Sequence, residues 1–255
     1  MSKYSYCFCT LAMGERYQLM AKDLASDLEK YAPDAILIVG TDDKRILKNC
    51  PNIQSFLHQQ TGLLHCYNDK RFVMARGLKD YRTAIYIDAD SRITGQLPAD
   101  LEFPIPIIGP HENLLEHLEK YRPRDVEKIK ILAQKIDVPI EEVQWVGEAL
   151  FMLTRAGGQE DEFLKNWGLM ANYLEMKGMH GGEGSILGLG AAQLGWQVQK
   201  TESWNQIANL FQHLDASASK PRPSWWASTQ KRLGYHYRLN KTRLNALSDY
   251  DFYYR

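Results

Sequence analysis

The sequence predicts an α/β protein in which helices flank a central β-sheet. Three observations support this fold class. The chain opens with a strand, a helix and a second strand, and an apolar strand in its first half ends abruptly in two aspartates. A further short apolar strand follows in the second half, ahead of a stretch with helical periodicity. Strands and helices that alternate at this spacing are typical of a nucleotide-binding α/β sheet.

The opening elements are predicted from residue type and spacing. Residues 4–11 form an aromatic and cysteine-rich strand, which Gly14 ends. Leucines at helical spacing predict a helix over residues 17–31, and the apolar residues 35–39 predict the second strand. The sequence contains neither a Gly-x-Gly-x-x-Gly motif nor a Walker-type loop. A nucleotide, if bound, would therefore be held by a metal and side chains.

A cation-rich segment precedes the apolar strand of the first half. Residues 49–66 predict a loop and a short helix that lead into a third strand, and residues 70–81 predict a longer helix. The cations of that helix are Lys70, Arg71, Arg76 and Lys79. A solvated helix face explains any one of them. Several cations ahead of a pair of acids would also suit an anionic diphosphate ligand.

The apolar strand at residues 84–87 ends in Asp88 and Asp90. Side chains alternate along a strand, so these two carboxylates point the same way while the chain stays extended. In open α/β sheets, ligands bind at the carboxyl ends of the strands. Two acids on one side are costly unless a cation or a proton neutralises them. The pair therefore predicts a cation site, with an ordinary acidic turn as the alternative.

The second half of the chain continues the alternation of strands and helices. Its predicted elements are a strand at 105–108, charged surface helices over 111–137 interrupted at Pro123, a buried strand at 149–153 and an amphipathic helix at 161–176. Glu148 stands at the entrance of the buried strand. A glycine-rich turn then presents His180 and Glu183 at the start of another helix. Three glycines around one acid indicate a tight turn or a close approach, although a glutamate that caps the helix is the alternative explanation.

Composition argues against several functional classes. The 31 basic and 31 acidic residues give a formal net charge of zero, so we do not expect a nucleic-acid binder. No apolar run approaches the ~20 residues of a membrane span, and the first residues lack the apolar stretch of a signal peptide. Cys7 and Cys9 are expected to face one side of the first strand as small core residues. We therefore expect a cytoplasmic protein.

In this order, the features resemble a glycosyltransferase of the GT-A type, a nucleotide-diphospho-sugar transferase with one α/β domain. Residues 71–93, RFVMARGLKDYRTAIYIDADSRI, are similar to the family 8 stretch in which an arginine-bearing helix precedes a strand ending in Asp-x-Asp. Residues 179–187, MHGGEGSIL, resemble the His-Asp-Glu-Ser helix start of family 6, which is related to the blood-group transferases. Residues 212–225 are similar to a family 8 His…Lys-Pro-Trp element, although three residues separate the proline from the tryptophan.

The resemblance implies a GT-A (Rossmann-like) fold with a mixed central sheet flanked by helices. The catalytic domain would span residues 1–225, and a basic and aromatic extension at 226–255 would pack on it. The implied activity is the metal-dependent transfer of a sugar from a nucleoside-diphosphate sugar, with a UDP-sugar as the expected donor, to a hydroxyl of a sugar or glycoconjugate. Both family resemblances point to retention of configuration. The C-terminal segment could instead bind the acceptor or contact membrane headgroups, so a peripheral membrane location is also expected.

The resemblance also assigns roles to individual residues. Asp90 would bind the metal directly, Asp88 would bind it through water or hold the ribose, and His213 would be the third ligand. Carboxylates suit Mg²⁺ or Mn²⁺, and a histidine ligand favours Mn²⁺. The expected donor contacts are Thr10, Ala12 and Tyr17 at the base and ribose, Arg71 with Arg76 in reserve, and Lys220 at the diphosphate. Glu183 is expected at the anomeric carbon or the acceptor hydroxyl, with Glu148 and His180 as second choices.

Two other functions remain open at this point. A phosphatase with an aspartyl nucleophile also places Asp-x-Asp after an apolar strand, but that class normally has Thr or Val where Arg92 stands here. A catalytically silent module that binds a sugar nucleotide would keep the same fold, although intact Asp88, Asp90 and Glu183 argue against it. A nucleotidyltransferase is less well supported, because its glycine-rich N-terminal loop is absent from the sequence.

Overall fold

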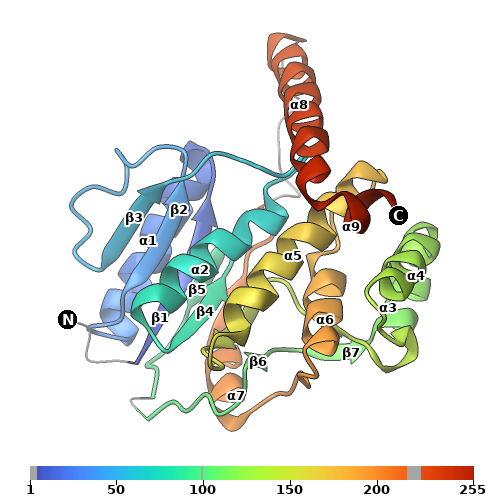
Figure 1. The fold of residues 1–255 in the computed structure, drawn as a ribbon. Helices are drawn as coiled ribbons and strands as arrows, with labels where there is room; N and C mark the ends of the chain where they lie inside the picture. Colours follow the sequence, from blue (N-terminus) through green and yellow to red (C-terminus); the bar gives the residue numbers. More distant parts are fainter. Residues whose placement is uncertain (1–4, 99, 217–224) are drawn as a thin grey trace.

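A six-stranded mixed sheet forms the centre of the computed structural model, which describes residues 5–98, 100–216 and 225–255 (Figure 1). The strand order is β3-β2-β1-β4-β9-β6. The first four strands in the chain pair in parallel: β1 (Tyr6–Ala12), β2 (Leu37–Thr41), β3 (Ile53–Leu57) and β4 (Thr83–Ile87). β9 (Leu150–Thr154) runs antiparallel to β4, and β6 (Ile107–Ile108) runs antiparallel to β9. This is the mixed α/β architecture that the sequence predicted.

Helices cover both faces of the sheet (Figure 1). α1 (Glu15–Tyr31) packs on one face, while α2 (Lys70–Asp80) and α5 (Gln159–Met176) pack on the other. The alternation of strand side chains explains the division. Cys7, Cys9 and Tyr86 enter the core cluster under α2 and α5, whereas Phe8 and Ile87 enter the cluster under α1. The prediction that Cys7 and Cys9 share one face is confirmed, and their sulfur atoms lie 3.8 Å apart.

Further elements extend the layer of α2 and α5. They are α3 (Leu114–Tyr121), α4 (Val126–Lys135) and α6 (Glu183–Gln193), with one short strand pair, β7 (His111–Asn113) with β8 (Gln144–Val146). A second short pair, β5 (Ser91–Ile93) with β10 (Phe211–His213), packs on the side of α1. The remaining helices are α7 (Glu202–Ala208), α8 (Trp225–Ala246) and α9 (Tyr250–Tyr254), with short 3₁₀ turns η1 (Tyr67–Asp69), η2 (Pro123–Asp125), η3 (Ile140–Glu142) and η5 (Leu247–Asp249).

Two sequence expectations about local structure are wrong. Residues 49–66 contain the strand β3 rather than a short helix, because Ile53 and its neighbours pair in parallel with β2. The charged region 111–137 is not a surface excursion. Leu118 and Leu132 are fully buried in the core cluster, so the dense charges of α3 and α4 concealed an apolar stripe that packs into that core.

The C-terminal helices differ in how they meet the rest of the protein. α8 rises away from the sheet and its flanking helices, as Figure 1 shows, whereas α9 lies against α5. Tyr253 of α9 is buried, and the ring of Phe252 lies 6.0 Å from that of Tyr173 in α5. Within the described residues, no helix combines the length and apolar character that crossing a bilayer requires.

Candidate active site

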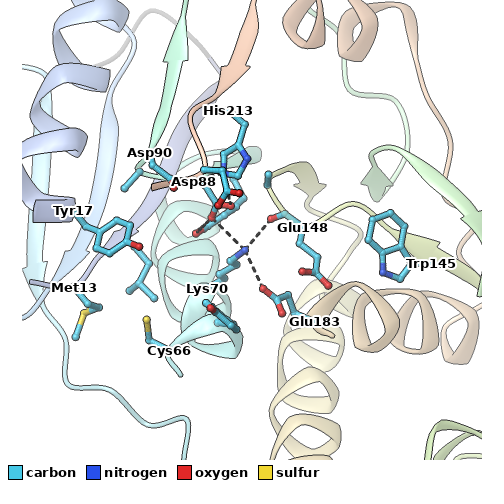
Figure 2. Close-up of a pocket in the computed structure, with 16 residues that line it drawn as sticks. Met13, Tyr17, Cys66, Lys70, Asp88, Asp90, Trp145, Glu148, Glu183 and His213 are labelled. Atoms are coloured by element: carbon cyan, nitrogen blue, oxygen red, sulfur yellow. Dashed lines mark hydrogen bonds and ion pairs between the residues drawn. The ribbon is translucent and has the colours of Figure 1, made fainter. Parts of the chain in front are cut away.

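Because β9 runs antiparallel to β4, the start of β9 lies beside the end of β4. The amide of Asp88, just after β4, donates a hydrogen bond of 3.0 Å to the carbonyl of Ala149, just before β9. Glu148 therefore lies at the same sheet edge as Asp88. A pocket of about 450 Å³ opens at this edge (Figure 2). Its charged lining residues are Lys70, Asp88, Asp90, Glu148, Glu183, His213 and Asp215.

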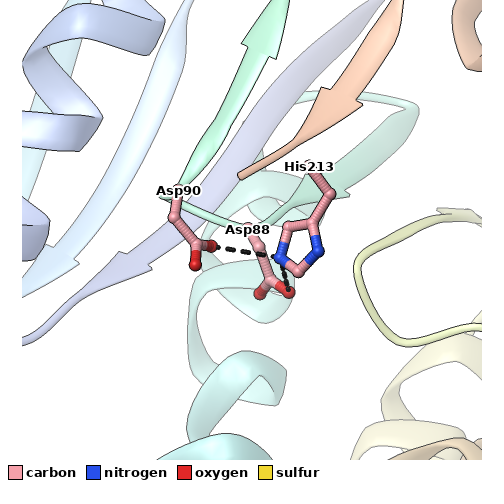
Figure 3. A group of neighbouring side chains, drawn as sticks. All are labelled: Asp88, Asp90 and His213. Atoms are coloured by element: carbon pink, nitrogen blue, oxygen red, sulfur yellow. Dashed lines mark ion pairs between the residues drawn. The ribbon is translucent and has the colours of Figure 1, made fainter. Parts of the chain in front are cut away.

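Asp88, Asp90 and His213 form a compact cluster at one side of the pocket (Figure 3). One ligand atom from each lies within 4.8 Å of the others. His213 Nε2 is 3.3 Å from Asp90 Oδ1 and 3.9 Å from Asp88 Oδ2. β10 delivers the histidine, because it pairs with β5 in a register that sets His213 opposite Ser91, the residue after Asp90. The grouping of these three residues that the resemblance implied is thus present in space.

A hydrogen bond to one oxygen of each carboxylate orients the two acids of this cluster. Asp90 is buried, and its Oδ2 accepts a hydrogen bond of 2.8 Å from the amide of Ala216. Asp88 Oδ1 accepts a hydrogen bond of 2.9 Å from the hydroxyl of Tyr86. The other oxygen of each acid is the one nearer the histidine ring. Two carboxylate oxygens and one imidazole nitrogen at these distances fit a single Mn²⁺ or Mg²⁺ ion.

Burial also raises the pKa of Asp88. Lys70 and the Tyr86 hydroxyl oppose this rise, while the charges of Glu183 and Asp90 add to it. The acid thus lies in an environment that favours a neutral form or a bound cation, as expected of a metal ligand.

Lys70 lies at the centre of the pocket, and the sequence did not single it out from the other cations of its helix. Its Nζ is 3.3 Å from Asp88 Oδ1 and 3.2 Å from Glu183 Oε1, and it donates a hydrogen bond of 2.9 Å to the carbonyl of Glu148. Burial alone would lower the pKa of this buried ammonium, but the surrounding acids, Asp88 first, outweigh that effect and raise it. Lys70 therefore stays charged.

The position of Lys70 in α2 explains why it reaches the site. α2 connects two parallel strands, so its first residues lie at the carboxyl edge of the sheet and its last residues lie at the opposite edge. Arg76 lies further along the helix and pairs with Asp80 at 3.0 Å on the surface. Arg71 donates to the carbonyl of Asn68 in η1. Its guanidinium packs under Gly168 of α5. Neither arginine lines the pocket, so their predicted contact with a donor has no support in this geometry.

Glu183 is the first residue of α6 and is buried against Lys70. Gly182, before it, has a left-handed φ of 87°, which favours glycine. A Cβ at Gly184 would lie 2.2 Å from the carbonyl of Val146, so this glycine lets α6 approach β8 closely. The amide of Gly184 donates to Glu148 Oε1 at 2.8 Å. Glu148, rather than Glu183, thus accepts from the start of the helix.

Glu148 has a strongly shifted pKa. Burial, followed by the charge of Glu183, raises the pKa of Glu148 to about 8, while Lys70 and the Gly184 amide oppose that rise. At neutral pH, Glu148 is therefore largely protonated and can donate a hydrogen bond.

The other residues assigned by the resemblance are dispersed. Tyr17 lines the pocket, whereas Thr10 is buried within β1 with its hydroxyl unpaired, and Ala12 is the buried last residue of that strand. His180 lies outside the pocket, with its ring 5.8 Å from that of Tyr235. Burial lowers the pKa of His180, and Lys128 adds to the effect. Lys220 lies outside the described residues.

Comparison with known proteins identifies the fold. No model of a known protein family matches the sequence, and no protein of curated function matches it significantly. Among solved structures, the bifunctional glycosyltransferase WbbM is similar, with 9% identity and a TM-score of 0.52 over 85% of this chain and 47% of that one. This chain therefore spans about half the length of WbbM.

The galactosyltransferase LgtC, solved with donor and acceptor sugar analogues, is also similar. Its identity to this chain is 11% and its TM-score is 0.50, over 92% of this chain and 95% of LgtC. Identities this low establish a shared architecture rather than a shared substrate. The chain has the fold of the GT-A type glycosyltransferases.

Proposed function

We propose that this protein is a metal-dependent glycosyltransferase that moves a sugar from a nucleoside-diphosphate sugar, expected to be a UDP-sugar, to an acceptor hydroxyl. The observation that carries the proposal is the position of the Asp88, Asp90 and His213 cluster on the wall of a pocket that also contains a buried lysine and a buried glutamate. The GT-A fold supports the same class of reaction.

The cluster would hold a divalent cation, with Mn²⁺ expected because one ligand is an imidazole. When bound, such an ion stabilises the negative charge that develops on a leaving diphosphate. Lys70 supplies a second, permanent cation beside Asp88 and Glu183. Its ammonium would bind an anionic donor and hold Asp88 and Glu183 in fixed orientations.

Glu183 is the carboxylate that we place at the anomeric carbon or the acceptor hydroxyl. It is buried and ion-paired with Lys70, and such a carboxylate suits a partner for positive charge on the sugar ring better than a base. This pairing favours retention over inversion, because an inverting enzyme needs a base that takes the proton of the acceptor. Glu148, largely protonated at neutral pH, would instead donate a hydrogen bond.

An aromatic surface at the other side of the pocket supports a sugar or glycoconjugate acceptor and a hexosyltransferase activity. Trp145 lines the pocket, and its ring stacks on that of His117 with 4.0 Å between centroids. Figure 2 shows Trp145 beyond Glu148, on the far side of the acids from Tyr17. Flat aromatic faces of this kind pack well against the apolar face of a sugar ring.

We place the catalytic domain at 1–225 and an extension at 226–255. Features of this extension support a peripheral membrane contact. α8 carries five lysines and arginines and no acidic residue. Four exposed apolar or aromatic residues line one stripe of this helix at spacings of seven, four and seven residues: Trp226, Leu233, Tyr237 and Leu244. Such a helix suits a surface of anionic lipids. The four cysteines form no disulfide with one another, which suits the reducing cytoplasm, so we place the protein on the cytoplasmic side.

A thermal-shift screen tests the proposed function. UDP, GDP and CDP are added with and without Mn²⁺, and we expect the melting temperature to rise for one diphosphate only when Mn²⁺ is present. The matching sugar nucleotide should then be turned over. A stabilised protein without turnover would indicate a silent binding module, and phosphate release from p-nitrophenyl phosphate would indicate a phosphatase.

A further inference from the structure

The loop at residues 58–66 forms part of the pocket wall. It connects β3 to η1, and its last residue, Cys66, lines the pocket together with Tyr67. Figure 2 shows Cys66 on the same side of the pocket as Met13 and Tyr17, the side proposed for the nucleotide. The loop contains no helix or strand. Its position therefore depends on hydrogen bonds from other parts of the chain.

Asp69 of η1 binds His58 and Thr61 at the start of this loop, and Leu63 is the point at which α5 and α8 hold its second half. The residue is fully buried, three positions before Cys66. Its amide donates to Glu175 Oε2 of α5 at 2.8 Å. Its carbonyl accepts from Arg238 of α8, at 2.8 Å from Nη2 and 3.3 Å from Nε. Both polar backbone groups of one loop residue are thus bound by ionisable side chains from distant helices, and the hydrogen bond from the Arg238 guanidinium is of the stronger, charge-assisted kind.

The inner face of α8 also meets the segment on which Glu183 stands. Tyr235 and Arg238 are three residues apart, so they lie on one face of the helix, which Thr242 and Ala246 continue as buried residues. The ring of Tyr235 contacts that of His180, three residues before Glu183. α8 therefore touches two chain segments that lead into the pocket lining, the loop at 58–66 and the turn before Glu183.

We propose that Arg238 is a positioning residue of the pocket. By binding the Leu63 carbonyl, it fixes the loop at 58–66 so that Cys66 and Tyr67 form a wall beside Tyr17. The effect on the nucleotide rests on the proposed function, whereas the effect on the loop does not. Without Arg238, the carbonyl exchanges a charge-assisted hydrogen bond for water, and the loop occupies a wider set of positions.

The first experiment needs no ligand. The full-length Arg238→Ala variant is treated with iodoacetamide, and alkylation of Cys66 is followed by mass spectrometry against Cys50 as an internal reference. We expect Cys66 to react at least threefold faster than in the wild type. Arg243→Ala, with the same charge change at an exposed position of α8, should leave the rate unchanged. Arg238→Lys should restore part of the protection, because an ammonium can donate to one carbonyl without the fork geometry of arginine. An unchanged Cys66 rate in Arg238→Ala overturns the proposal.

The second experiment separates positioning from simple stabilisation. Calorimetric titration with UDP and Mn²⁺ should give an affinity about tenfold weaker for Arg238→Ala than for the wild type and Arg243→Ala. A lower melting temperature with unchanged affinity would mean that Arg238 only secures the helix, and the proposal would then be wrong. A wild-type protein that binds no nucleoside diphosphate contradicts the proposed function instead, and the Cys66 rates alone then decide the role of Arg238.

Discussion

Lys70 and Glu183 form a buried ion pair, with 3.2 Å between Nζ and Oε1. The same ammonium lies 3.3 Å from Asp88, so it connects the cluster of Asp88, Asp90 and His213 to the acid on the opposite side of the pocket. One cation thus fixes the relative orientation of the two groups on which the proposed reaction depends.

Replacement of Lys70 by methionine should therefore harm both stability and activity. The variant leaves Asp88 and Glu183 buried without their shared counter-charge, which typically costs about 3 kcal/mol of unfolding free energy. We expect kcat to fall ~10²-fold or more, in the range for a group that stabilises developing charge. Urea unfolding and turnover of the sugar nucleotide measure the two effects, with Lys79→Met on the exposed part of α2 as the matched control. Near-normal turnover of Lys70→Met would contradict this role.

The Asp90→Asn variant tests the metal cluster. An asparagine can still accept the hydrogen bond of the Ala216 amide through its oxygen, so the fold should be retained. The loss of one anionic ligand should abolish the Mn²⁺-dependent part of the thermal shift and reduce turnover to background. Asp80→Asn, which changes a surface acid paired with Arg76, serves as control. A variant that keeps both the metal-dependent shift and turnover would show that Asp90 is not a ligand.

The two glutamates should respond differently to substitution. Glu183→Gln is expected to lower kcat ~10²-fold with little change in KM, because its carboxylate acts on the reacting sugar. Glu148 has a pKa of about 8 and is protonated below that pH, so Glu148→Gln should be much milder at pH 7. Wild-type activity should decline above pH 8, where deprotonation adds a negative charge to the site. That decline should be weaker in Glu148→Gln, and equal effects of the two variants at pH 7 would argue against these roles.

Glu175 predicts a pH dependence of stability. Burial raises its pKa from the ordinary 4.5 to about 7. Between these values the folded protein holds a proton that the unfolded chain has released, so the free energy of unfolding falls as the pH rises through this window and levels off above it. Relative to Glu175→Gln, which stays neutral, the wild type should lose about 3 kcal/mol between pH 4.5 and pH 8. Urea unfolding at both values measures the difference, and parallel stability curves would refute the assignment.

The outer stripe of α8 predicts binding to anionic vesicles. Leu233 and Leu244 are 67% and 68% exposed, and lysines and arginines lie beside them. Cosedimentation with vesicles that contain phosphatidylglycerol should exceed that with phosphatidylcholine alone and weaken as salt is added. The Leu233→Ser, Leu244→Ser double variant should bind at least tenfold less tightly. Leu57→Ser on β3, where the leucine is equally exposed at 68%, should have no effect. Equal binding to neutral and anionic vesicles would contradict an electrostatic contact.

The sequence predicted those parts of the site that are local in the chain. Asp88 and Asp90 follow an apolar strand directly, so their closeness in sequence predicted that both lie at the sheet edge, although the chain turns at residues 89–90 instead of staying extended. Glu183 was found because the glycines around it mark a close approach, which the packing of Gly184 on Val146 confirms. In these cases the physical constraint and the residue that reveals it are neighbours in sequence.

Lys70 could not be recognised in the same way. Its partners, Asp88 and Glu183, come from elements far apart in the chain, and Glu148 joins them only because β9 runs antiparallel to β4. The sequence predicts the basic helix, but the resemblance assigns the contact with the donor to the neighbouring cation, Arg71. Consecutive helical residues point in directions about 100° apart. Lys70 therefore faces the pocket, whereas Arg71, one position later, faces α5.

The path of the chain around the catalytic edge has an evolutionary consequence. After β5 the backbone leaves this edge, and it returns at Glu148, where the hydrogen bond between Asp88 and Ala149 sets the distance between the two strands. Residues 94–147 leave this edge and return to it, and between these points they supply β6 and the buried leucines of α3 and α4. Insertions or deletions in the exposed connections of this segment would reshape the side proposed for the acceptor over generations, while Asp88 and Glu148 stay in place.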